Sequence, residues 1–288
     1  MTGKSTSLHA RAKINLILRV LGRAPDGYHQ LETLFQRIAL ADDVTVRTGT
    51  SADTLDATWG SAPREDLGPV EQNLAWRAAV AYRTATGWLA RFGIEITKRI
   101  PTRAGLGGGS ADAAAVLRAL DALAPTPLGS ARLLQLAASL GADVPFLASD
   151  ASLAIGRGRG DRIEILPALP AASVAVMVPV FGISTAEAYA DLARARSAST
   201  YPPPTFRLDA ATLTAWDQVA GQQINDFEST VFARYPALAA ARVELERTGA
   251  QAARLSGSGS ALFGLREGAW NVDPARFPAF RVIHTTTS

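Results

Sequence analysis

Hydrophobic and polar positions follow two periods along the chain. Runs with a period of two predict strands, and runs with a period near 3.6 predict amphipathic helices. The clearest strand covers residues 12–20, in which Lys13 and Asn15 lie on one face and alternate apolar residues lie on the other. Further strands are predicted at 34–38, 44–47, 92–100, 151–166 (a hairpin), 173–181 and 252–265 (a strand pair). Helices are predicted at 73–85, about 110–123, 130–140, 185–194, 225–233 and 237–247.

The mixture of these elements predicts an α+β protein with two domains. Strands and helices do not follow the regular cadence of a parallel barrel, and the sequence has no repeat of fixed period. The P-A-L-P run at 167–170 is the best candidate for a linker. We therefore predict an N-terminal domain over residues 1–166 and a C-terminal domain over residues 167–288.

Two segments bear on where the protein is located. The stretch 165–186 carries no charge and is long enough for a membrane span. Three prolines and Gly182 interrupt it, so a linker and a buried strand fit better. The first residues, M-T-G-K-S-T-S, lack the apolar core of a secretory signal. We expect a cytoplasmic protein with no membrane partner, whose first residues are poorly ordered.

Composition narrows the classes of function. Hydrophobic residues make up 48% of the 288 positions, which is enough for a packed core. The absence of cysteine excludes disulfide scaffolds, iron–sulfur clusters, thiolate zinc sites and a cysteine nucleophile. The net charge is only +3 and no segment forms a basic tail, so we expect no nucleic-acid partner. Among 29 basic residues only Lys4, Lys13 and Lys98 are lysines, which makes their positions informative.

The segment G-L-G-G-G-S from Gly105 to Ser110 is the first candidate for chemistry. Its glycines let the backbone approach an anion, and the helix predicted after it adds free N–H groups and the positive end of a helix dipole. It is not a Walker A loop, and it is not G-x-G-x-x-G, because Ser110 stands where the third glycine would be. The segment predicts a phosphate cradle, with a flexible turn or tight helix packing as the alternative.

Lys13 and Asp143 are the next candidates. An ammonium in the middle of a strand is costly unless it is paired. Lys13 is therefore either exposed on an edge strand or a charge held near a phosphate or a carboxylate. Asp143 lies in G-A-D-V-P-F, whose apolar residues would partly bury it. It is either a base that takes a proton from a hydroxyl or a turn residue that bonds its own backbone.

A second glycine-rich segment, L-S-G-S-G-S, covers residues 255–260. Its small residues allow close approach to a ligand or to another strand, or they form a sharp hairpin. Phosphoryl transfer needs an anion cradle, a positive charge near the transferred group and a residue that orients the hydroxyl. The sequence offers one candidate for each.

Six motifs resemble those of the GHMP kinases. They are A-K-I-N-L, D-G-Y-H, G-L-G-G-G-S-A-D-A-A, G-A-D-V-P-F, N-D-F-E and L-S-G-S-G-S, and they run in order from Ala12 to Ser260. The glycine motif is shared across this family. The combination of A-K-I-N-L, D-G-Y-H and G-A-D-V-P resembles most closely the members that act on 4-diphosphocytidyl-2-C-methyl-D-erythritol in the non-mevalonate isoprenoid pathway.

The resemblance implies a two-domain α+β fold and an activity. The N-terminal domain would be like ribosomal protein S5 domain 2, the C-terminal domain would be ferredoxin-like, and the active site would lie in the cleft. The reaction would transfer the ATP γ-phosphate to the 2-hydroxyl of the cytidyl substrate, with Mg²⁺ as the metal. The partner would be this small molecule, and the protein would be a monomer or a homodimer.

Motif by motif, the resemblance also implies roles for single residues. Asp143 would be the general base, Lys13 would assist it, and Asn15 would contact the substrate. The ATP-binding residues would be Asn73, Leu74, Lys98, Pro101, Gly105, Leu106, Gly107, Gly108, Gly109 and Ser110.

The cytosine of the substrate would have its own group of residues. Tyr28 and His29 would hold the base, and Tyr189 would lie on its opposite face, with Phe181 as a nearby alternative. No carboxylate ligand for Mg²⁺ stands out in the sequence, and Ser110 is the candidate for a metal contact.

Two positions depart from the family pattern. Arg11 stands where the family commonly has proline, and Asp112 stands where many members have asparagine. An added carboxylate near phosphates is unfavourable unless it faces a metal or solvent. The alternatives are another GHMP kinase acting on homoserine, mevalonate or a sugar, a nucleotide-binding module without catalysis, and a nucleic-acid reader. D-G-Y-H argues against the first, and the presence of both Lys13 and Asp143 argues against the second.

Overall fold

The computed structural model describes residues 3–23, 29–60, 62, 64–197 and 207–288. By their contacts, the residues form two compact units. Unit 1 comprises Met1–Ala12, Leu40–Thr102 and Gly107–Asp150. Unit 2 comprises Lys13–Ala39, Arg103–Leu106 and Ala151–Ser288. We predicted two continuous domains, residues 1–166 and 167–288, whereas each compact unit combines several segments of the chain. The predicted domain boundary stays a prediction.

The first sheet has the order β3-β4-β2-β5-β6, with β1 paired to β2. Its strands are β1 (Ser5–Arg23), β2 (His29–Thr48), β3 (Thr54–Trp59), β4 (Phe92–Lys98), β5 (Leu153–Gly158) and β6 (Arg162–Leu166). Strand β2 is shared, because residues 43–48 pair with β4 in unit 1 and residues 31–36 pair with β5 in unit 2. The predicted hairpin at 151–166 is confirmed, since β5 and β6 pair antiparallel.

Strand β2 is continuous where we predicted two strands, 34–38 and 44–47. Between them lies Asp42, a poor strand former whose carboxylate is fully buried. It accepts hydrogen bonds from the Lys98 ammonium and from the backbone N–H groups of Arg99 and Ile100. These partners let the strand pass through a position that its own propensity would interrupt. Near the N-terminus, the carbonyl of Lys4 accepts a hydrogen bond from Thr48 N, just before strand β1 begins.

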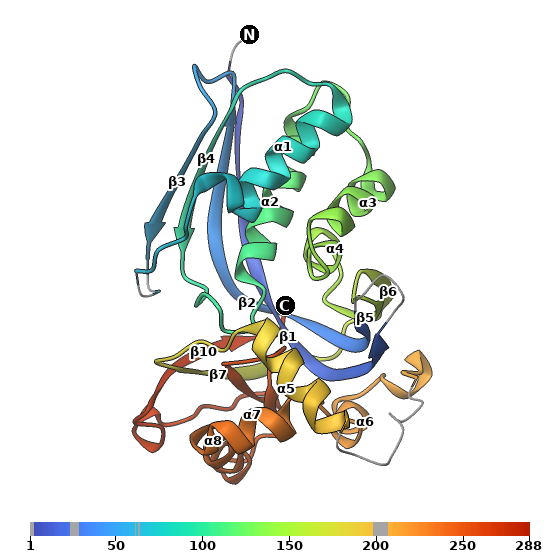
Figure 1. Ribbon diagram of the computed structural model, residues 1–288, viewed down its shortest axis with the longest axis vertical. Coiled ribbons are helices and arrows are strands. Elements are labelled where there is room, and N and C mark those ends of the chain that lie inside the picture. The colour runs from blue at the N-terminus through green and yellow to red at the C-terminus, as the bar shows by residue number, and fades with distance from the viewer. Residues whose placement is uncertain (1–2, 24–28, 61, 63, 198–206) are drawn as a thin grey trace. The chain divides into compact units, whose positions relative to one another are not determined.

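The helices of unit 1 pack together, with α1 beside α2 and α3 beside α4 (Figure 1). They are α1 (Leu74–Thr86), α2 (Gly108–Leu123), α3 (Ser130–Leu140) and α4 (Val144–Ala148), preceded by the short 3₁₀ turn η1 (Val70–Gln72). The predicted ends of α3 are confirmed, and α4 was not predicted. Helix α1 begins after Asn73, whose side chain accepts a bond from Ala75 N, and ends at the left-handed Gly87.

Unit 2 contains an antiparallel sheet with the order β10-β7-β9-β8. Its strands are β7 (Ala172–Pro179), β8 (Ala252–Leu255), β9 (Leu262–Glu267) and β10 (Phe280–Thr286). The helices are α5 (Thr185–Ser197), α6 (Trp216–Gly221), α7 (Glu228–Arg234) and α8 (Pro236–Arg247), with the 3₁₀ turns η2 (Ala210–Thr212) and η3 (Pro274–Arg276).

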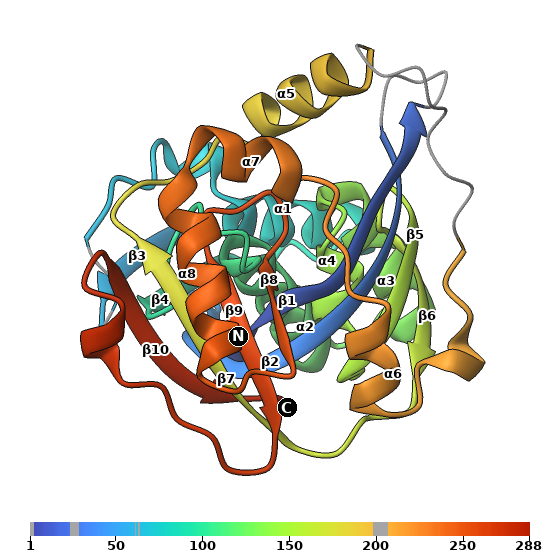
Figure 2. The same ribbon diagram turned by 90° about the horizontal axis from the view of Figure 1, so that it is seen from below.

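Helix α8 packs on β8 and β9, and α7 packs on α8 (Figure 2). Leu238 and Leu245 of α8 meet Leu255 and Leu262 of the sheet in one buried core. Sheet-on-helix packing of this kind is the α+β arrangement expected for the C-terminal part. Strand β10 and helix α6 were not predicted. In the described part of the chain, no helix is both long and apolar enough to span a bilayer.

Candidate functional site

The glycine segment forms the start of helix α2. The helix begins at Gly108, earlier than the predicted residue 110, and Gly107 at its N-cap has φ 73°. The first bond of the helix runs from Ala111 N to Gly107 O. The N–H groups of Gly108, Gly109 and Ser110 therefore have no acceptor within the helix. These donors and the positive end of the dipole can receive an anion.

Gly105 is required by packing in unit 2. A Cβ atom there would lie 2.0 Å from the carbonyl oxygen of Ser256, and its φ is +75°. Ser256 Oγ donates to Gly105 O at 2.8 Å, and Ala261 N donates to Ala104 O at 3.1 Å. The close approach that we predicted for L-S-G-S-G-S is thus made to the segment 104–105. The same residues form the connection between β8 and β9, so the hairpin alternative also holds.

Lys13 is buried, with 3% of its surface exposed, and the edge-strand alternative is wrong. Its ammonium donates to Asn15 Oδ1 at 2.6 Å and to Gly105 O at 3.0 Å. It also lies over the Phe35 ring, 5.8 Å from the centroid. Leu106 O accepts from Lys13 N at 3.0 Å, so the backbone of β1 holds the glycine segment as well. Two oxygens and a ring face thus contribute to holding the buried ammonium.

The N-D-F-E motif holds the second glycine-rich segment in place. Asn225 is buried, and its Nδ2 donates to the carbonyls of Leu255 and Gly257 at 2.8 Å each. Glu228 accepts from Leu255 N at 2.9 Å. Burial raises the pKa of Glu228, and the bond from Leu255 and the nearby arginines work against this rise. The motif therefore fixes the backbone that meets Gly105.

Asp143 belongs to unit 1 and is half-buried at the N-cap of α4. Its side chain makes no capping hydrogen bond to that helix. Val144 and Phe146 directly after it are buried, as the sequence predicted. A carboxylate in this partly desolvated position has the environment that a proton acceptor needs.

Lys98 lies in a second buried cluster, within unit 1. Its ammonium donates to Asp42 and, at 2.6 Å, to Asp112 Oδ2. Burial alone would lower the pKa of Lys98, but the charges of Asp112 and Asp42 outweigh it and raise the pKa. Burial raises the pKa of Asp112 to about 7, against the effect of Lys98 and together with that of Asp42. Asp112 thus faces an ammonium, where we expected a metal or solvent.

This cluster packs against the first turn of helix α2. The Cβ position at Gly108 lies 3.7 Å from Lys98 Nζ and 3.1 Å from the Ile100 side chain. Leu74 lies near the same turn, 3.8 Å from the Cβ position of Gly109, and Pro101 is buried. Leu74, Lys98 and the helix start therefore lie close together. Their contact with a nucleotide stays a prediction, and Lys98 already has two carboxylate partners.

The aromatic residues of the cytosine prediction lie in unit 2. His29 and Tyr189 stack with ring centroids 4.3 Å apart and 13° between planes. Phe181 instead stacks on Tyr235, which favours Tyr189 as the neighbour of His29. The predicted residue Tyr28 lies outside the described residues. Two rings at this separation leave no space for a third ring between them.

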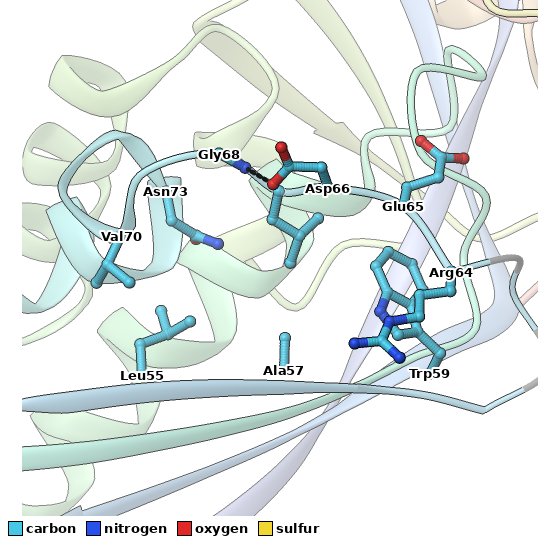
Figure 3. A pocket seen from close by; sticks show the side chains of 10 residues that line it. Leu55, Ala57, Trp59, Arg64, Glu65, Asp66, Gly68, Val70 and Asn73 are labelled. Atoms are coloured by element: carbon cyan, nitrogen blue, oxygen red, sulfur yellow. Dashed lines mark hydrogen bonds between the residues drawn. The ribbon is translucent and has the colours of Figure 1, made fainter.

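A pocket of about 470 Å³ opens in unit 1 over strand β3. Leu55, Ala57 and Trp59 point from the strand into it, while Asn73 lines its other side (Figure 3). The remaining lining residues are Arg64, Glu65, Asp66, Leu67, Gly68 and Val70. An apolar floor with polar groups at the rim suits a flat ring with polar edges.

Few side chains of the described residues could serve as ligands for the predicted Mg²⁺ ion. Within the described ranges, no three His, Asp or Glu side chains cluster in a way that could hold an ion. Ser110 is half-buried in the first turn of α2. A magnesium ion held mainly by phosphate oxygens, with one hydroxyl from the protein, fits this donor set. Arg11, the other departure from the family pattern, is exposed.

Comparison with known proteins decides the family. Residues 73–150 match the protein family described as "GHMP kinases N terminal domain". Residues 209–268 match the family described as "GHMP kinases C terminal". A protein of Solibacter usitatus named 4-diphosphocytidyl-2-C-methyl-D-erythritol kinase is 43% identical over 267 residues, covering 92% of this chain and 82% of its own. The chain belongs to the GHMP kinase family.

Other relatives of this GHMP kinase agree. A Moorella thermoacetica protein of the same name is 38% identical and covers 90% of this chain and 89% of its own. The solved structure of 4-(cytidine 5'-diphospho)-2C-methyl-D-erythritol kinase has a TM-score of 0.77 at 34% identity, covering 98% of this chain and 99% of that one. The homoserine kinase of Cytophaga hutchinsonii, with a TM-score of 0.66 at 16% identity, covers 99% and 94% and shares the fold.

These findings confirm several predictions. The two-domain GHMP kinase fold with mixed helices and strands is confirmed, and the protein is a phosphotransferase. GHMP kinases use ATP as the phosphoryl donor. The individual site residues and the cleft stay predictions.

Sequence reasoning missed several residues of the candidate site. Leu55, Ala57 and Trp59 of the pocket floor were not predicted, although T-L-D-A-T-W alternates with a period of two. Asp42 and Thr33, which hold Lys98 and Asn15, were also missed. Buried polar residues inside strands are the signal that could have found both.

Proposed function

We propose that this GHMP kinase transfers the γ-phosphate of ATP to the 2-hydroxyl of 4-diphosphocytidyl-2-C-methyl-D-erythritol. The observation that carries the proposal is the 43% identity over nearly the whole chain to a kinase named for this substrate. The chain has the motif expected to bind the ATP phosphates and the motif expected to bind the cytidyl substrate. It also has the buried Lys13 and the half-buried Asp143.

In the proposed reaction, Asp143 accepts the proton of the 2-hydroxyl as its oxygen attacks the γ-phosphorus. The bond between that phosphorus and the β,γ-bridging oxygen breaks, and ADP leaves with the electron pair. Lys13 stabilises the negative charge that develops on the transferred group. Its partners, Asn15 and Gly105, orient the ammonium for this purpose.

The proposal assigns the ATP moieties to features of the chain. The phosphates bind the N–H groups of the glycine segment and the start of α2. The adenosine binds the pocket over β3, with Asn73 at its rim. Mg²⁺, when bound, neutralises charge on the β- and γ-phosphate oxygens, and Ser110 Oγ is the candidate protein ligand.

The cytosine is assigned to His29, Tyr189 and Tyr28. Because His29 and Tyr189 stack on each other, the base can stack on Tyr189 from that side only after the His29 ring has moved away. His29 would then donate or accept hydrogen bonds at the edge of the base. The expected cytoplasmic location, the monomeric or homodimeric state and the lack of a nucleic-acid partner stay predictions.

The first test is an assay of ADP release with a panel of acceptors. It includes the cytidyl methylerythritol, homoserine, mevalonate and a hexose. Release that depends on the cytidyl compound supports the proposal, whereas preference for another acceptor contradicts it. Asp143→Asn should lower kcat by about 10²–10⁴-fold and leave ATP affinity close to normal. Retained turnover would remove Asp143 as the base.

The second test separates the two substrates. His29→Ala should raise the KM for the cytidyl substrate and leave the KM for ATP nearly unchanged, because in the proposal the ring contacts the cytosine and no part of ATP. A matched control is Phe181→Ala, which removes the ring that stacks on Tyr235. An equal rise of both constants in His29→Ala would contradict the cytosine assignment.

A further inference from the structure

A chain of buried hydrogen bonds connects Thr33 to Lys13 in unit 2. Thr33 Oγ1 donates to Ile17 O at 2.7 Å, and Asn15 Nδ2 donates to Thr33 Oγ1 at 2.8 Å. Asn15 Oδ1 then accepts from the Lys13 ammonium at 2.6 Å. The side chains of Thr33, Asn15 and Lys13 have 1%, 3% and 3% of their surface exposed. Water therefore does not replace these bonds easily.

The hydroxyl of Thr33 determines how the Asn15 amide is oriented. A hydroxyl has one proton to donate, and the proton of Thr33 goes to the carbonyl of Ile17. Towards Asn15 the hydroxyl oxygen can only accept, so the group that faces it must be the NH₂ of the amide. The oxygen of the amide must then face Lys13. The reverse orientation would place an NH₂ group against an ammonium, donor against donor.

The oriented amide in turn fixes the ammonium. Lys13 donates two of its three N–H bonds to Asn15 Oδ1 and Gly105 O. Gly105 O is itself held, because Ser256 Oγ donates to it at 2.8 Å. Two fixed N–H bonds of a tetrahedral ammonium determine the direction of the third.

We propose that Thr33 is a positioning residue for the reaction, which acts through Asn15 to set the direction of the Lys13 ammonium. The inference rests on the proposed function, because it gives this orientation a role in phosphoryl transfer. Thr33 itself touches neither substrate nor the reacting atoms. Its loss is therefore expected to slow the chemical step and to leave nucleotide binding unchanged.

The kinetic test compares Thr33→Val with Thr33→Ser. Valine keeps the shape of the side chain and removes the hydroxyl, whereas serine keeps the hydroxyl. We expect Thr33→Val to lower kcat by about 10–100-fold with the KM for ATP within about twofold of normal, and Thr33→Ser to restore most of kcat. The control is Thr230→Val, which removes a hydroxyl that donates to Phe227 O without any link to Lys13.

A second test reads the amide directly and needs no substrate. The chain has four asparagines, Asn15, Asn73, Asn225 and Asn271, so ¹⁵N-asparagine labelling gives four side-chain NH₂ signals. The Asn15 signal is assigned by its loss in Asn15→Asp. Its hydrogen exchange should be slow in the unsubstituted protein and at least about tenfold faster in Thr33→Val. Asn225, bonded to two carbonyls, should stay slow in both.

The outcomes separate the two proposals. Absence of ADP release with the cytidyl acceptor defeats the proposed function, while the exchange measurement still decides the orientation of the amide. Equal kcat in Thr33→Val and Thr230→Val, or equal loss of kcat in the valine and serine variants, overturns the positioning role. If Thr33→Val does not fold, the hydrogen exchange of the Asn15 side chain in the unsubstituted protein is the deciding measurement. Asn15 exchange as fast as that of the exposed Asn271 overturns the inference.

Discussion

The two buried lysines of this GHMP kinase are held in different ways. Lys98 in unit 1 donates to the carboxylates of Asp42 and Asp112. Lys13 in unit 2 donates to an amide oxygen and a backbone carbonyl, which are neutral. At Lys98 the carboxylates offset the charge of the ammonium, whereas at Lys13 the amide oxygen and the carbonyl set the direction of two N–H bonds. The comparison supports a structural role for Lys98 and fits the role in charge stabilisation that we propose for Lys13.

The largest effect on stability is expected for Lys98→Met. The variant leaves Asp42 and Asp112 buried without a cation, and breaking a buried pair in this way costs about 3–5 kcal/mol. The measurement is urea unfolding of the variant beside Lys13→Met. A free energy of unfolding for Lys98→Met equal to that of the unsubstituted protein would contradict the structural role.

For Lys13→Met we expect a smaller loss of stability than for Lys98→Met and a large loss of activity. Its removal takes a donor from Asn15 Oδ1 and Gly105 O, and these lost hydrogen bonds cost about 1–3 kcal/mol of unfolding free energy. The value of kcat should fall by about 10²–10³-fold, as for other groups that stabilise charge in a transition state. Steady-state kinetics and unfolding are measured on the same preparation. Full activity in Lys13→Met would break the comparison.

A third prediction concerns the carbonyl that receives Lys13. In Gly105→Ala the new Cβ would meet Ser256 O, and φ would stay at +75°, so we expect a loss of about 2–4 kcal/mol. Gly87→Ala is the control, because Gly87 has φ +68° and open space around its Cβ position. There we expect about 1–2 kcal/mol. Equal losses would show that the contact with Ser256 contributes nothing.

The last prediction concerns the pH dependence of stability. Burial raises the pKa of Asp112 to about 7 from its ordinary value of 3.8, so between these values the folded state binds more protons than the unfolded state. The unfolding free energy that Asp112 contributes therefore falls as the pH rises from about 4 to about 7. Asp112→Asn keeps an oxygen for Lys98 and removes this slope.

Thermal or urea unfolding at several pH values checks this last prediction. The unsubstituted protein should lose roughly 1–4 kcal/mol relative to Asp112→Asn across the window. Identical slopes in both proteins would mean that Asp112 titrates near its ordinary pKa.

Local signals in the sequence determined much of the fold. Helix α3, residues 130–140, ends before Gly141 as predicted. Asn73 caps the start of helix α1. Periodicity and capping depend on neighbours within a few residues, which is why they can be read from the chain alone. The same alternation placed Lys13 and Asn15 on one face, where they form a hydrogen bond.

The sequence by itself determined the family, the motifs and the residue types available for chemistry. Only the tertiary structure decided how these residues are held. Lys13 is buried because Gly105, 92 positions away, and Asn15 supply oxygens for its charge. Strand β2 continues through Asp42 because Lys98 reaches it from 56 positions away. Burial and partner atoms are set by contacts between distant segments, and no local pattern encodes them.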